Sequence, residues 1–200
     1  TWKTPSVPVQ DLSSDSLLIG APRTDFQGKN VPSLGGLVLL AKLGQGGMGA
    51  VYFGVHPRLQ QEVAIKVLPL FLADHQPSLV TRFVREARIA AQVRSPHLVT
   101  VTDVNQEGGL FYLVMEFING VTANTHLKNA LQAGQPGLDE AVALDICIAA
   151  TEGLAAAHAE GVVHRDVKPD NIMIPRHKRL DELMFTEAKL TDLGLARSMD

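Results

Sequence analysis

The sequence predicts an α+β fold of two lobes, with an antiparallel sheet first and helices later. Between residues 36 and 70, three short β-rich runs flank a glycine cluster and tight turns, which is typical of an antiparallel sheet. Further along, Asp139–Glu160 is a long alanine-rich segment followed by Gly161, the pattern of a long helix. Strands in one part of a chain and helices in another favour the α+β class.

Composition narrows the class of protein before any motif is considered. The chain has 200 residues, of which 46% are hydrophobic, so it is long and apolar enough for a folded domain. Its net charge of −3 and the scattered Lys and Arg give no reason to expect nucleic acid as a partner. Its only cysteine, Cys147, excludes an intrachain disulfide. The apolar stretch 141–157 is interrupted by Asp145 and Glu152, so we expect a soluble helix and no membrane segment in this chain.

Changes in amino-acid composition divide the chain into three parts. Residues 1–34 are rich in Ser, Pro, Asp and Gly, and we expect a flexible linker or loosely docked extension there. Residues 35–118 carry the strand-like runs and form the first lobe with its connection to the second. Residues 119–200 form part of the second lobe.

The elements follow in order. Strands are expected at 36–44, 50–55, 62–70, 98–104 and 110–117. A helix is expected at 79–93, where Leu79, Phe83 and Ala87 recur at helical spacing before Ser95-Pro96. Residues 119–138 should form a loop with a short helix. After the long helix we expect short strands at 162–174 and 188–197, separated by a charged insert that forms a solvated hairpin.

The glycine cluster has the spacing G-x-G-x-x-G-x-V, with Gly44, Gly46, Gly49 and Val51 at its fixed positions. Unrelated nucleotide-binding folds share this spacing, so its context decides. Because β-branched and aromatic residues follow the glycines, the loop joins two strands. Glycine allows backbone N–H groups to approach phosphates without an intervening Cβ. A flexible hairpin turn without a ligand is the alternative.

A lysine follows on the third strand, in the string Val63-Ala64-Ile65-Lys66. Alternation puts Ala64 and Lys66 on one face of the sheet, the face that the glycine loop covers. The lysine can there neutralise phosphate charge, with Glu86 on the next helix as its natural partner. Taken singly, Lys66 could also be a solvated edge residue, and Glu86 a surface carboxylate.

The most specific string is His164-Arg165-Asp166-Val167-Lys168-Pro169-Asp170-Asn171. It offers a carboxylate to orient a hydroxyl, a lysine for a migrating phosphoryl group and an amide oxygen for a metal. Asp192, in Thr191-Asp192-Leu193-Gly194, supplies a second oxygen ligand of the kind that Mg²⁺ prefers.

Taken together and in this order, these motifs resemble the protein-kinase signature set. The resemblance extends from Leu37 to Asp200, and Lys168, two residues after Asp166, marks the Ser/Thr branch. The chain looks most like bacterial members. The resemblance implies a two-lobe protein-kinase-like fold. Its N-lobe would be an antiparallel sheet with one main helix, and its C-lobe mainly helical and incomplete.

The resemblance also implies a role for each matching residue. The glycines would close over the ATP phosphates, and Lys66 would contact the α- and β-phosphates and pair with Glu86. Met115 would be the gatekeeper behind the adenine, whose edge the backbone at Glu116 and Ile118 would read. The catalytic residues would be Asp166 and Lys168, and the Mg²⁺ ligands Asn171 and Asp192. The full set expected around ATP is Leu43, Gly44, Gln45, Gly46, Gly47, Met48, Gly49, Ala50, Val51, Ala64, Lys66, Glu86, Met115, Glu116, Ile118 and Met173.

The implied function is a serine/threonine protein kinase that transfers the γ-phosphoryl group of ATP, with Mg²⁺, to protein hydroxyls in the cytoplasm. A longer parent protein could be anchored in a membrane. Leu193 stands where Phe is commoner, and the 21 residues from Asn171 to Asp192 exceed the usual spacing. The chain also stops at Asp200, before an activation segment. A non-catalytic nucleotide-binding or scaffolding module, and a small-molecule kinase of related fold, are therefore kept as alternatives.

Overall fold

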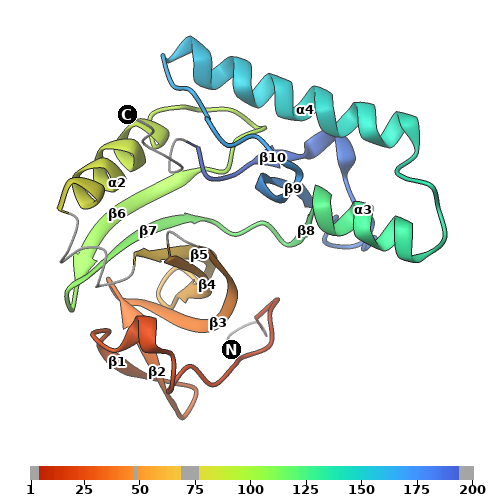
Figure 1. The fold of residues 1–200 in the computed structure, drawn as a ribbon. Helices are drawn as coiled ribbons and strands as arrows, with labels where there is room; N and C mark the ends of the chain where they lie inside the picture. Colours follow the sequence, from red (N-terminus) through yellow and green to blue (C-terminus); the bar gives the residue numbers. More distant parts are fainter. Residues whose placement is uncertain (1–4, 47–48, 69–76, 194–200) are drawn as a thin grey trace. The chain divides into compact units, whose positions relative to one another are not determined.

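The computed structural model describes residues 5–46, 49–68 and 77–193 (Figure 1). The chain divides into two compact units. The first contains residues 1–88 and 101–117, and the second contains residues 89–100 and 118–200. The boundary therefore differs from the expected division at residue 118, because residues 89–100 belong with the second unit.

The first unit contains a seven-stranded antiparallel sheet in the order β1-β2-β3-β4-β5-β7-β6. This confirms the predicted antiparallel sheet, and all five strands expected between residues 36 and 117 are present. The strands are β1 (Arg23–Phe26), β2 (Lys29–Leu34), β3 (Leu37–Gly46), β4 (Gly49–His56), β5 (Gln61–Leu68), β6 (Val101–Glu107) and β7 (Leu110–Glu116).

Residues 5–34 correct the expectation of a flexible linker. They form the short 3₁₀ helix η1 (Ser16–Leu18) and the β1–β2 hairpin, which adds two strands to the sheet. The hairpin turns at Gln27 and Gly28, both with positive φ, as a tight two-residue turn requires. Leu12 and Leu18 are buried in the same core cluster as Tyr52. Leu12 and Leu18, at 6% and 4% exposure, therefore fix this segment to the sheet, while Ile19 is exposed.

Two expected elements begin or end elsewhere than predicted. Helix α2 (Pro77–Ala90) ends earlier than expected, and β6 starts at Val101, three residues after the predicted start. The reason for the second shift is that Leu98 and Val99 pair with Leu190 of the second unit; the Val99 N–H donates to the Leu190 carbonyl over 2.8 Å.

The second unit is built from helices and a small sheet in the order β10-β9-β8. Its helices are α3 (Ala123–Gln132) and α4 (Glu140–Ala159), and its strands are β8 (Gly120–Thr122), β9 (Ile172–Pro175) and β10 (Lys189–Leu190). Two short 3₁₀ helices, η2 (Pro169–Asn171) and η3 (Phe185–Glu187), complete it. Residues 176–183 between β9 and η3 form a hairpin, as expected for the charged insert, with Arg176 bridged to Leu183.

The long helix α4 agrees with its predicted bounds to within one residue at each end, with Asp139 and Glu160 as its cap residues. The Asp139 carboxylate caps its first turn by accepting from the N–H groups of Ala141 and Val142 over 2.9 and 3.3 Å. By length and composition α4 is the one helix of the described residues that could cross a membrane, a test that core helices also pass. Its buried residues, Ile146, Ala149, Ala150, Gly153 and Ala157, make one packed stripe. Leu144 and Ile148 are exposed.

Candidate active site

The glycine cluster joins two strands of the first unit, as its sequence context predicts. Gly44 lies opposite Val51 in the register of β3 and β4, and Gly46 lies opposite Gly49, which has a φ of 121°. A Cβ added at Gly44 or Gly46 would meet no atom within 4 Å, so their backbones border open space. Such an open, side-chain-free edge fits the phosphates of a nucleotide. Gly47 and Met48 lie outside the described residues.

The sheet register brings four predicted nucleotide residues to one face. Lys66 lies opposite Val51 on β4, and Ala64 lies opposite Met115 on β7. Directly opposed residues of antiparallel strands share a face, and residues two apart on one strand share it as well. Val51, Ala64, Lys66 and Met115 therefore lie on one face, while Ile65 points into the core cluster on the other.

Lys66 is buried on this face, with 8% of its surface exposed. An ammonium group in such surroundings requires an anionic or hydrogen-bonding partner, because burial of an isolated charge is costly. The side chain of Glu86, the expected partner on α2, lies outside the described residues. The ion pair between the two remains a prediction.

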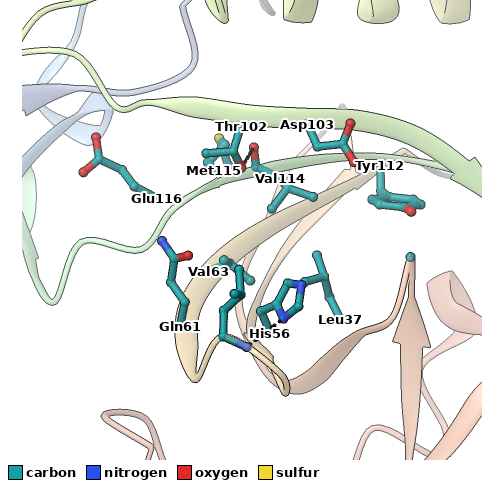
Figure 2. Close-up of a pocket in the computed structure, with 12 residues that line it drawn as sticks. Leu37, His56, Gln61, Val63, Thr102, Asp103, Tyr112, Val114, Met115 and Glu116 are labelled. Carbon is teal, nitrogen blue, oxygen red and sulfur yellow. Dashed lines mark hydrogen bonds between the residues drawn. The ribbon is translucent and has the colours of Figure 1, made fainter.

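The first unit also contains a cavity that was not predicted from the sequence. It has a volume of about 260 Å³, and Figure 2 shows Val63 and Val114 beside it, with His56 and Gln61 on one side and Asp103 on another. Val63 and Val114 belong to the core cluster opposite to the face of Lys66. Glu116 lies two residues after Val114 on β7, on the same face of the sheet, and it also lines the cavity.

In the second unit, His164 fixes the start of the catalytic string. It is 1% exposed, its Nδ1 accepts the Asp166 N–H over 3.3 Å, and its Nε2 lies 2.9 Å from the carbonyl oxygen of Thr191. Because Nδ1 accepts, the ring proton is assigned to Nε2, which then donates to Thr191. Both ring nitrogens hold the backbone, so His164 is a structural residue.

Two predicted site residues, Lys168 and Asn171, converge on the Asp166 carboxylate. Lys168 Nζ lies 2.7 Å from Asp166 Oδ2, and Asn171 Nδ2 donates to the same oxygen over 3.0 Å. Asn171 Nδ2 also donates to the Asp166 carbonyl over 2.8 Å. The hydrogen bond from Lys168 lowers the pKa of Asp166, and the same contact raises the pKa of Lys168. The pair is thus held in its charged form.

The second candidate metal ligand is delivered by a strand pair. β9 and β10 pair Met173 with Lys189, and the Thr191 N–H donates to the Asn171 carbonyl over 2.9 Å. Asp192 follows directly, in the left-handed region at a φ of 61°. Strained backbone of this kind is common at functional sites.

The donor set fits a divalent cation. Because Asn171 uses Nδ2 to hold Asp166, its Oδ1 can serve as an oxygen ligand together with the Asp192 carboxylate. Among the described residues there is no group of three or more His, Cys, Asp or Glu side chains placed to hold a metal. A cation at these two residues would therefore take its remaining oxygens from phosphate and water, as Mg²⁺ usually does.

One supporting contact was not foreseen in the sequence. Asn124 Nδ2, in the first turn of α3, donates to Asp170 Oδ1 over 2.6 Å and so ties the helix to the loop of Lys168 and Asn171. Forty-six residues separate the two, and neither carries a motif that points to the other.

The predicted residues fall into two groups, one in each unit. Apart from Gly47, Met48 and the Glu86 side chain, the first unit holds those from Leu43 to Glu116. The second unit holds Ile118, Asp166, Lys168, Asn171, Met173 and Asp192. The first unit thus has a glycine-edged sheet with a buried lysine, and the second a loop with a charge-paired aspartate and two candidate metal ligands, the features that the resemblance to protein kinases predicts.

The chain belongs to the protein kinase family, because residues 37–200 match the family model described as the protein kinase domain. It is 38% identical over 162 residues to the probable serine/threonine-protein kinase pknA2 of Bifidobacterium longum, covering 80% of this chain and 20% of that protein. It is 38% identical over 166 residues to the serine/threonine-protein kinase Pkn1 of Myxococcus xanthus, covering 83% and 22%. The chain thus spans about a fifth of these relatives.

The fold agrees with solved kinase structures. A crystal structure of the PknI kinase domain of Mycobacterium tuberculosis superposes with a TM-score of 0.67 at 29% identity, covering 81% of this chain and 59% of that one. A second structure of the same domain gives a TM-score of 0.64 at 28% identity, covering 82% and 62%. The two-lobe kinase fold implied by the resemblance is confirmed.

Proposed function

We propose that the protein containing this chain is an ATP-dependent serine/threonine protein kinase. The observation that carries the proposal is the convergence of Lys168 and Asn171 on one oxygen of Asp166. This arrangement leaves the carboxylate charged, oriented and beside a cation, which is what transfer to a hydroxyl requires. The names of the bacterial relatives support the Ser/Thr class.

In this proposal the first unit binds ATP. The backbone of Gly44, Gly46 and Gly49 faces the phosphates, and Lys66 contacts the α- and β-phosphates from the adjoining strands. We assign the adenine to Val51, Ala64 and Met173, with Met115 behind it and the backbone of Glu116 and Ile118 at its edge. The shared face of Val51, Ala64, Lys66 and Met115 supports this assignment.

The second unit carries the transfer chemistry. Asp166 orients the Ser or Thr hydroxyl and accepts its proton as the oxygen attacks the γ-phosphorus. The bond from that phosphorus to the bridging oxygen of ADP breaks, and the new phosphoester forms. Lys168 places a positive charge beside the transferring group. When bound at Asn171 and Asp192, Mg²⁺ neutralises phosphate charge.

The alternatives have less support. A scaffolding module that binds nucleotide without turnover does not need the Lys168–Asp166 pair at 2.7 Å. A small-molecule kinase agrees poorly with relatives named as protein kinases. We also propose that the partners are proteins and that the kinase domain lies in the cytoplasm, where ATP is its substrate.

The test is phosphoryl transfer by the whole protein, compared with Lys66→Met and with Lys29→Met, a matched change at an exposed residue of β2. Wild type and Lys29→Met should phosphorylate a serine-rich protein substrate. Lys66→Met should lose about 10²–10³ in rate, because a placed charge is removed from the phosphates. ATP binding without transfer in the wild type would favour the scaffold, and full activity of Lys66→Met would refute the assigned site.

A further inference from the structure

The strand that leads into the glycine cluster is irregular. In the register of β3 with β4, the pairing shifts between Leu39 and Ala41 and again between Lys42 and Gly44. Each bulge leaves one residue of β3 without a residue opposite it and bends the strand. On its other edge, β3 pairs with β2 only at Leu37 and Val38. The part of β3 that reaches the glycines therefore needs support from elsewhere.

Gln10 supplies part of that support. Its backbone N–H donates to the Leu40 carbonyl over 2.8 Å, and its side-chain Oε1 accepts from the Lys42 N–H over 3.0 Å. Leu40 and Lys42 lie at the two bulges. A single residue from the N-terminal segment thus takes the place of a strand partner at both irregular points of β3.

Asp15 holds the same place through side chains. Its Oδ2 accepts from the Tyr52 hydroxyl over 2.9 Å and lies 3.1 Å from Lys42 Nζ. Lys42 and Tyr52 are the last directly opposed pair before the second bulge, and the ammonium lies 5.8 Å from the centre of the Tyr52 ring. The Asp15 side chain is only 10% exposed, and its Oδ1 accepts from the Leu17 N–H over 3.1 Å.

The segment that carries these residues is anchored on both sides of Asp15. Leu12 and Leu18 are buried in the core cluster that contains Tyr52. Residues 5–34 all precede the range that matches the kinase family model, which starts at residue 37. The contacts to β3 are therefore an addition that this chain makes to the matched domain.

We propose that Gln10 and Asp15 are positioning residues for ATP: by fixing β3 at its two bulges, they hold the backbone of Lys42–Gly46 in the conformation that binds phosphate. The inference rests on the proposed function, since it assigns the ligand of the glycine cluster. Neither residue is a catalytic residue, because each acts through β3.

The test measures nucleotide affinity and turnover separately in the whole protein. Asp15→Asn removes the charge at Lys42, and Gln10→Ala removes the bond to the Lys42 N–H. Asp11→Asn is the matched control, since Asp11 is exposed and its carboxylate accepts from the Ser13 N–H over 2.9 Å, a bond within the N-terminal segment. Asp15→Asn and Gln10→Ala should raise the Kd and KM for ATP about fivefold, the low end for coupled sites. The kcat and the KM for the protein substrate should stay near wild type, as should all constants of Asp11→Asn.

A merely structural role predicts a different result. It would lower the melting temperature of Asp15→Asn while leaving the Kd for ATP unchanged well below that temperature, and this outcome would overturn the proposal. If Asp15→Asn does not fold, the Kd for ATP of Gln10→Ala, a change at an exposed residue, decides between the two roles. An unchanged Kd for ATP in Gln10→Ala would also overturn the proposal. A wild-type protein that binds no ATP would instead reject the proposed function.

Discussion

Lys168 Nζ lies 2.7 Å from Asp166 Oδ2, the same oxygen that accepts the amide of Asn171 over 3.0 Å. Both contacts converge on one oxygen, so we assign the substrate hydroxyl to the other, Oδ1. The lysine is close enough to Asp166 to keep it ionised. In the proposed function the same lysine also meets charge on the transferring phosphoryl group, so one side chain would both hold the base in its charged state and stabilise the transition state.

Replacing this lysine should affect turnover more than ATP binding. Lys168→Met keeps a chain of similar length but removes the charge, and kcat should fall about 10²–10³-fold. The KM for ATP should change little, because the glycines and Lys66 that we propose to meet the phosphates lie in the other unit. Lys178→Met, at an exposed residue of the charged insert, is the control and should retain wild-type kinetics. An equal loss of kcat in Lys168→Met and Lys178→Met would contradict the role assigned to Lys168.

The same contact predicts a shift in pH dependence. Because Lys168 lowers the pKa of Asp166, the carboxylate stays charged as the pH falls, to below the ordinary aspartate value of 3.8. The acid limb of kcat/KM in the wild type should therefore lie below that pH. In Lys168→Met the pKa of Asp166 should rise towards its ordinary value, and the limb should move to higher pH. Rate profiles on protein shown to be folded by circular dichroism would measure this, and coincident limbs would contradict it.

Gly153 should be essential to the packing of α4. A Cβ at this position would lie 2.5 Å from the His97 carbonyl oxygen, a backbone atom that cannot move aside alone. Gly153→Ala should cost about 1–3 kcal/mol of stability, as overpacked sites do. Helix propensity alone would predict a gain, since alanine is favoured over glycine within helices.

The control for that prediction is Gly137→Ala, where the added Cβ meets nothing within 4 Å. Thermal or denaturant unfolding of the two variants separates the clash from a general effect of replacing glycine. A Gly153→Ala protein as stable as wild type would show that α4 does not pack on residue 97 as described.

Much of the fold follows from local patterns in the sequence. The strands on either side of the glycine cluster are short apolar runs bounded by turns, and Asp139 and Gly161 mark the ends of the long helix. Residues 5–34 could not be predicted in this way, because β1 and β2 are short and surrounded by Pro, Ser and Gly. Their place in the sheet depends on burial of Leu12 and Leu18 against strands that come later in the chain.

The candidate site also has parts that the sequence predicts and parts that it does not. The string from His164 to Asn171 is specific enough to predict roles for Asp166, Lys168 and Asn171 from their order, and the structure brings these three side chains into contact. The contacts of Gln10 and Asp15 with β3, and of Asn124 with Asp170, are single side-chain bonds between distant segments. No periodicity or spacing in the sequence predicts such bonds, because they depend on the three-dimensional path of both segments.

The central claim is that Asp166 serves transfer from ATP to protein hydroxyls, and one comparison tests it most directly. Whole wild-type protein and Asp166→Asn would be incubated with ATP, Mg²⁺ and a protein substrate, and phosphoserine and phosphothreonine measured by mass spectrometry. The wild-type protein should form phosphoserine, phosphothreonine or both. Asp166→Asn should bind ATP with unchanged affinity but form almost no phosphorylated product. Equal phosphorylation by the two proteins would contradict the account.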